Sequence, residues 1–146
     1  MRTQKELSAH VAEFGVQYAS DNLKMEKINI GYRDISYFKT IEHCAKLVPM
    51  INCIIFNLDW LESASPNDIL KVAFFQTRAA FQLSAIKNPS KYKLDTKTLE
   101  AWREDLTSPL EHDEEAYYDL GTTKDAIKFT EELMNQLHVE LESNAK

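Results

Sequence analysis

Histidine is the side chain best suited to metal binding and to acid-base catalysis, and its spacing in this sequence supports neither. Two histidines are followed three residues later by a glutamate, as His10 is by Glu13. A carboxylate-bridged di-iron bundle needs inward Glu-x-x-His pairs on two helices and further glutamates, a pattern that this sequence lacks. We therefore expect no metal site. The four histidines, all far apart, are His10, His43, His112 and His138.

The two cysteines, Cys44 and Cys53, stand nine residues apart in an apolar segment that we interpret as helical. On a straight helix they would point in different directions and could not form a disulfide. Apolar surroundings raise the pKa of a thiol and so disfavour the reactive thiolate. The neighbouring His43 would point about 100° away from Cys44 on a helix. We expect two buried free thiols.

Two further catalytic patterns are also missing from the sequence. A phosphate-binding loop needs clustered glycines before a lysine and a hydroxyl residue, whereas Gly15, Gly31 and Gly121 are widely separated. Helical ribonucleases place a histidine shortly after an arginine, but Arg33 and His43 stand ten residues apart. We therefore expect that the protein is not an enzyme and that it binds no cofactor.

An acidic segment from Leu99 to Leu120 is the strongest charge feature of the chain. It holds eight carboxylates and one base, Arg103, although the net charge of the whole chain is only −6. Aromatic side chains ringed by carboxylates suit the binding of a basic protein surface, and closely spaced carboxylates can imitate DNA phosphates. The alternative is a solvated face. The predicted partner-binding residues are Trp102, Glu111, Asp113, Glu114, Glu115, Tyr117, Tyr118 and Asp119.

Composition places the chain among ordinary globular proteins. Its 146 residues, 44% of them apolar and 27% charged, suit a single helical domain spanning residues 1–146. The amino-terminal stretch lacks the apolar core of a signal peptide, and no apolar run approaches the ~18 residues of a membrane span. The sequence thus predicts a cytoplasmic protein that does not bind membranes.

Helical periodicity predicts an all-α fold, a compact bundle of five to six helices. The central helix should span Pro66 to Lys87, since Ser65 can cap it and Asn88-Pro89 ends it. Apolar stripes on two faces place this helix inside the bundle, with Phe75 and Leu83 among the residues expected in the core. A first helix is expected from about Thr3 to Lys24, with Gly15 allowing another helix to come close.

A second long helix is expected from about Asp34 to Glu62, because apolar residues recur along it at helical spacing. Pro49 falls in its middle, where it removes a main-chain donor and clashes with the carbonyl of Ala45. The helix should therefore be kinked near Pro49. Two more helices are expected nearer the carboxyl terminus, a short one after Asp95 or Thr96 and a terminal one from Thr122 to about Glu142.

The opening TQKELSAHV resembles the start of many bacterial helix-turn-helix domains, and the resemblance implies DNA binding. With Gly15 as the turn glycine, the recognition helix needs apolar residues near positions 21 and 24, where this sequence has Asp21 and Lys24. The resemblance therefore covers about nine residues and departs from the pattern after them.

Taken together, the sequence predicts a small acidic protein that binds a basic partner and inhibits or regulates it. The partner could be a nucleic-acid-binding protein, as for an immunity-like or phage-type antagonist, with no direct binding of nucleic acid by this chain. One alternative is a helical enzyme or ligand-binding domain with a cavity between the central and kinked helices, to which Asn52, Gln76 and Arg78 contribute polar groups. A helix-turn-helix DNA binder is the second alternative. The oligomeric state is not predicted.

Overall fold

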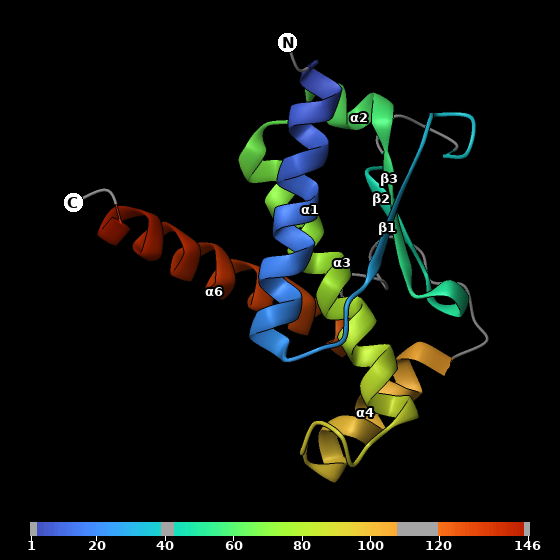
Figure 1. The fold of residues 1–146 in the computed structure, drawn as a ribbon. Helices are drawn as coiled ribbons and strands as arrows, with labels where there is room; N and C mark the ends of the chain where they lie inside the picture. The colour runs from blue at the N-terminus through green and yellow to red at the C-terminus, as the bar shows by residue number, and fades with distance from the viewer. Residues whose placement is uncertain (1–2, 39–42, 108–119, 145–146) are drawn as a thin grey trace.

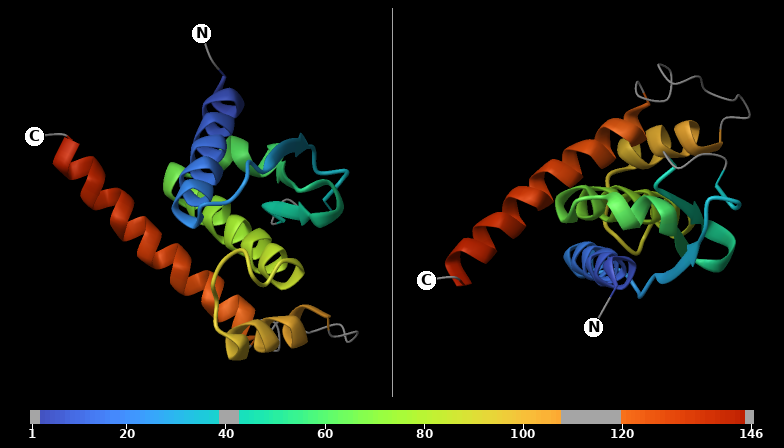
Figure 2. Two further views of the ribbon diagram at one scale, coloured as in Figure 1. Left: turned by 60° about the horizontal axis from the view of Figure 1, so that its bottom comes forward. Right: turned by 90° about the horizontal axis from the view of Figure 1, so that it is seen from above.

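A long helix, α3, forms the middle of the molecule, and the other elements pack around it (Figures 1 and 2). The computed structural model describes residues 3–38, 43–107 and 120–144. Within these ranges α1, α6 and a three-stranded sheet pack on different sides of α3, and α1 and α6 also contact each other through the hydrogen bond from Tyr18 to Glu140. The elements are α1 (Gln4–Leu23), β1 (Asn29–Arg33), β2 (Ala45–Val48), η1 (Pro49–Ile51), β3 (Cys53–Asn57), α2 (Leu58–Ser63), α3 (Pro66–Lys87), α4 (Thr96–Thr107) and α6 (Gly121–Asn144).

The bounds of α3 are those that its sequence predicts. The Ser65 side chain caps the helix by accepting a hydrogen bond of 3.2 Å from the Asp68 main-chain N–H, and Pro66 occupies the first turn, where its missing donor costs nothing. Asn88 follows as the C-cap. The prediction of a central helix with these ends is confirmed.

At Gly15 the helices α1 and α3 approach each other closely. A Cβ atom at this position would lie 2.7 Å from the Cβ of Ala73 and 3.2 Å from a methyl carbon of Leu70. Ala12 and Ala19, on the same face of α1, are fully buried. Small residues therefore set the distance between the two helices, and the predicted role of Gly15 is confirmed.

We expect Gly15→Ala to lower the free energy of unfolding by about 1–2 kcal/mol, because the overpacking cost outweighs the gain in helix propensity. Ala73→Gly removes the atom that the new methyl group meets, so it should cost less in the Gly15→Ala background than in the original protein. Urea unfolding of the two single variants and the double variant measures this coupling. A Gly15→Ala variant more stable than the parent would contradict the close approach.

The predicted all-α bundle is wrong, because the segment expected to form a kinked helix contains two strands and a turn. The sheet order is β1-β3-β2, with β1 parallel and β2 antiparallel to β3. Pro49 starts the 3-10 turn η1 between β2 and β3, and Asn52 closes that turn with a φ of 48°. A turn accommodates proline better than a helix interior, because Pro49 there breaks no i→i−4 hydrogen bond.

The apolar spacing was misleading because β3 is buried on both faces. Ile54 and Phe56 pack on the side of α1 and α3, while Cys53 and Ile55 are covered from the other side by Phe38. A strand covered on both faces reads as a continuous apolar run and cannot be distinguished from a buried helix by periodicity. Since α1 is followed by β1, the second helix that a helix-turn-helix requires is also absent there.

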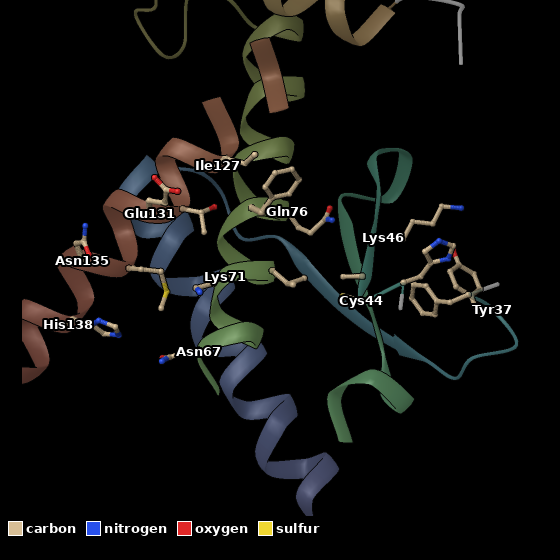
Figure 3. Close-up of a pocket in the computed structure, with 17 residues that line it drawn as sticks. Tyr37, Cys44, Lys46, Asn67, Lys71, Gln76, Ile127, Glu131, Asn135 and His138 are labelled. Carbon is tan, nitrogen blue, oxygen red and sulfur yellow. The ribbon is translucent and has the colours of Figure 1, made fainter. Parts of the chain in front are cut away.

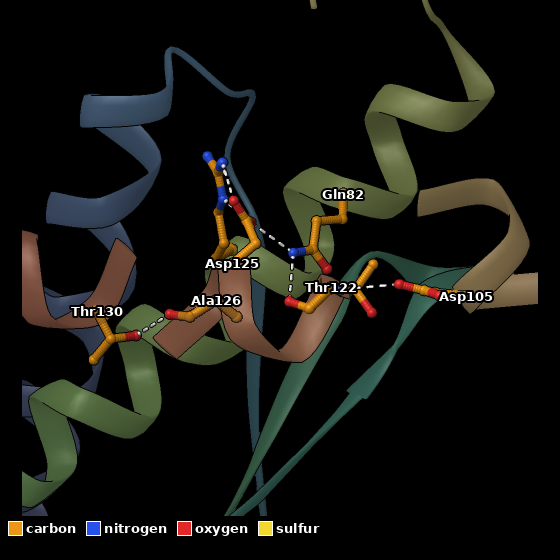
Figure 4. A network of polar contacts seen from close by, with 7 residues as sticks. Gln82, Asp105, Thr122, Asp125, Ala126 and Thr130 are labelled. Carbon is orange, nitrogen blue, oxygen red and sulfur yellow. Dashed lines mark hydrogen bonds and ion pairs between the residues drawn. The ribbon is translucent and has the colours of Figure 1, made fainter. Parts of the chain in front are cut away.

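A polar network fastens α6 to α3 and α4 (Figure 4). The Arg78 guanidinium makes two hydrogen bonds to the Asp125 carboxylate, of 2.7 and 3.0 Å. The buried Gln82 amide donates to the same carboxylate at 2.7 Å and to the Thr122 carbonyl at 2.9 Å. Asp105 of α4 accepts from the Thr122 main-chain N–H at 3.1 Å. The start of α6 is thereby fixed in position.

Candidate functional site

A cleft of about 1180 Å³ opens between β2, α3 and α6 (Figure 3). Lys71 and Gln76 come from α3, Glu131 and Asn135 from α6, and Lys46 from β2, on the side opposite α6. The residues that line the cleft are Tyr37, Phe38, His43, Cys44, Ala45, Lys46, Asn67, Lys71, Val72, Phe75, Gln76, Ile127, Thr130, Glu131, Met134, Asn135 and His138.

Apolar side chains line the inner part of the cleft. Val72 and Phe75 of α3 are half-buried, and Ile127 of α6 keeps 36% of its surface exposed. Met134 of α6 and Phe38 also line the cleft and are buried. An exposed apolar surface in a concave site is the usual lining of a binding pocket.

The rim of the cleft is positively charged in an otherwise acidic chain. Its charged residues are Lys46, Lys71 and Glu131, a net +1, while the chain as a whole carries −6. Among the described residues, no carboxylate lies within ion-pair distance of either lysine. The Lys46 ammonium lies 5.7 Å from the centre of the Tyr37 ring. Two exposed cations without a carboxylate partner can attract an anionic group to the cleft.

The cleft contains one thiol, and its environment makes it a poor nucleophile. Burial, followed by the negative charge of Asp68, raises the pKa of Cys44 above its ordinary value. The thiolate that would attack a substrate is therefore scarce near neutral pH. No disulfide joins Cys44 and Cys53; Cys53 is buried, as the sequence predicts, whereas Cys44 is only partly buried. Across the part of the chain that the structure describes, no group of three or more metal-ligating side chains is brought together.

Of the residues predicted to bind a partner, the structure describes only Trp102. Its side chain is 5% exposed and meets the Phe81 ring edge-on, with 6.1 Å between the ring centres. Trp102 thus packs in the core between α3 and α4. The other residues predicted for this surface lie outside the described residues, and their role stays a prediction; they are Glu111, Asp113, Glu114, Glu115, Tyr117, Tyr118 and Asp119.

The structure separates the three polar residues assigned to a cavity between two helices. Gln76 lines the cleft, whereas Arg78 belongs to the network that holds α6. Asn52 lies in the β2–β3 turn, donates to the Lys27 carbonyl at 3.2 Å and borders a smaller cavity of about 330 Å³. The cavity as predicted does not form, because one of its two walls is a sheet.

Sequence reasoning missed Lys46 and Lys71 as possible binding residues. They are 25 positions apart, in segments of different secondary structure, and only the packing of β2 beside α3 brings both to one rim. One signal was available: Lys71 is a charged residue that stands between the apolar residues Leu70 and Val72 of α3.

Comparison of the chain with protein-family models, curated proteins and solved structures finds no match. In the described part of the chain, no helix is both long enough and apolar enough to cross a membrane. The chain thus folds as a mixed α/β domain with an open cleft that is lined by apolar side chains and carries Lys46 and Lys71.

Proposed function

We propose that this protein binds a short segment of a partner protein in the cleft between β2, α3 and α6. The observation that carries the proposal is that apolar side chains and two exposed lysines line the same cleft, and that the lysines have no carboxylate partner among the described residues. The matching segment carries apolar side chains for the floor and carboxylates for the rim. Binding of this kind suits an inhibitory or regulatory protein.

The size of the cleft favours a polypeptide over a small molecule. Pockets for small ligands usually measure about 300–1,000 Å³ and enclose most of the ligand, whereas this cleft is larger and open to solvent. Peptide segments commonly bind in such open grooves, where apolar anchors supply affinity and charges at the rim supply orientation and specificity.

Selection from a random peptide library, displayed against the immobilised protein, tests the proposal. We expect the recovered peptides to be rich in apolar and acidic residues. Their affinity should fall about tenfold or more when Lys46→Glu and Lys71→Glu are combined, since each change replaces an attraction by a repulsion. The loss should be largest at low salt, where screening is weakest.

A matched control carries the same change of charge away from the cleft. Lys97 of α4 and Lys124 of α6 are both exposed and do not line it. The variant Lys97→Glu/Lys124→Glu should bind the selected peptides as the parent protein does. Peptides that bind both double variants equally well, or a selection that recovers no peptide, would refute the cleft as the binding site.

The charge of the segment from Leu99 to Leu120 favours a second candidate function, binding of a basic protein through its carboxylates. Combined replacement of Asp113, Glu114 and Glu115 by serine should slow association with such a partner and leave the stability of the fold equal or higher. Tyr117→Ala should instead speed dissociation, because a packed contact is lost. Binding kinetics at two salt concentrations separate the two effects, and unchanged rates would mark the segment as a solvated face.

A further inference from the structure

We propose that the bound segment joins the sheet as a fourth strand, paired with the free edge of β2. The inference rests on the proposed function and specifies how the same cleft is used. Among the described residues, the sheet order β1-β3-β2 gives β2 a neighbouring strand on one side only. Exposed strand edges are established sites for the addition of a peptide strand.

The register shows which main-chain groups of β2 are directed outwards. The Asn57 N–H donates to the Cys44 carbonyl at 2.9 Å, so residues 44 and 57 form a hydrogen-bonded pair of the antiparallel ladder. Such pairs alternate along the ladder, and Lys46 paired with Ile55 is the next one. The N–H and C=O groups of Ala45 and Leu47 therefore point away from β3. Among the described residues, no turn or loop main-chain hydrogen bond involves Ala45 or Leu47.

The free edge of β2 borders the cleft. Ala45 and Lys46 line one side, α3 supplies the floor, and α6 forms the opposite side with Ile127 and Glu131 (Figure 3). An extended segment between β2 and α6 would thus have main-chain partners along one edge and side-chain contacts below. A docked helix would contact the same floor but would leave the outward groups of β2 without new partners.

The two faces of β2 predict the pattern of the added strand. The side chains of Ala45 and Leu47 face the helices, in the core with Phe56 and Ile54. Lys46 points to the other face, where its ammonium lies over the Tyr37 ring. Successive residues of the added strand would face α3 and the Lys46 side in turn. The segment that fits alternates apolar and acidic residues.

The probe is a short synthetic peptide in which valine and glutamate alternate. Its control is a peptide of the same composition in which the valines recur at helical spacing instead. Amide hydrogen exchange of the full-length protein, measured by NMR, reports each main-chain group. With the alternating peptide, exchange at Ala45 and Leu47 should slow about tenfold or more, whereas the Lys46 amide, already bonded within the sheet, should change little. The control peptide should protect neither residue.

Two methylated versions of the alternating peptide give a second measurement. One carries N-methyl groups on the valines and the other on the glutamates, so only one version blocks the amides that pair with β2. We expect one version to lose affinity about tenfold or more and the other to bind as before. Equal binding of both versions, or tight binding without protection of Ala45 and Leu47, would overturn the added strand.

The outcomes also separate this inference from the proposed function. If the alternating peptide does not bind but library peptides bind in a manner that depends on Lys46 and Lys71, the cleft is the binding site and the added strand is refuted. If no peptide shows binding that depends on Lys46 and Lys71, both the proposed function and the added strand are refuted.

Discussion

Phe74→Ala should lower the free energy of unfolding by about 3–5 kcal/mol, among the largest effects of any single substitution in the described chain. The Phe74 side chain is fully buried between α1 and α6, where it packs with Leu70 and Leu133. Its ring centre lies 5.9 Å from that of Tyr18. Alanine would leave a cavity at the junction of three helices, which cannot collapse without moving their backbones. Urea unfolding at neutral pH measures the loss.

The adjacent Phe75 provides a control of identical chemistry. Phe75 is only partly buried and lines the cleft, so Phe75→Ala should cost only about 1–2 kcal/mol. The Phe75→Ala variant should nevertheless bind the peptides more weakly. The Phe74→Ala variant should bind them as the parent protein does, wherever it is folded. Equal destabilisation by the two substitutions would mean that α3 is rotated relative to the arrangement described above.

Asp125→Ala should lower the free energy of unfolding by about 2–4 kcal/mol, because it leaves the Arg78 guanidinium without its carboxylate partner. Only 16% of the Arg78 side chain is exposed, and its guanidinium carbon lies 4.7, 5.4 and 5.1 Å from the ring centres of Phe81, Trp102 and Phe129. The aromatic faces hold the cation but cannot replace two charge-assisted hydrogen bonds. The Gln82 amide loses an acceptor as well.

Glu132→Ala is the matched control for Asp125→Ala, since it removes another carboxylate of α6 that is paired with a cation. Glu132 lies 4.0 Å from Lys128, and both side chains are mostly exposed. Exposed pairs of this kind contribute little, so the loss should be below about 0.5 kcal/mol. Thermal or urea unfolding of the two variants compares them directly. An Asp125→Ala variant as stable as the Glu132→Ala variant would show that the network in Figure 4 does not hold α6 in place.

For the acidic segment, the sequence determines the charge, whereas the structure determines which side chains are exposed. Its excess of carboxylates is a property of composition and holds whatever the fold is. The inclusion of Trp102 among its contact residues depended instead on which way the helix α4 faces. The structure buries that side chain against Phe81, so the candidate surface rests on the residues that follow α4.

Helix ends and the contact at Gly15 were determined by the sequence itself. Ser65, Pro66 and Asp68 act within one turn of each other, and helical hydrogen bonds join residues only four apart, so the signal and its effect are local. The same local patterns could not decide whether Phe74 or Phe75 is buried, because apolar residues occur on more than one face of α3. That choice depended on where α1 and α6 pack.

Only the tertiary structure decided that residues 29–57 form a sheet and that a cleft opens beside it. The partners of a strand are remote in sequence: Asn29 pairs with Cys53, a contact that no local pattern encodes. Burial on both faces removed the alternation that would have marked β3. The cleft likewise combines Lys46, Lys71 and Glu131 from three elements, because a concave surface arises only where separate elements pack with a space between them.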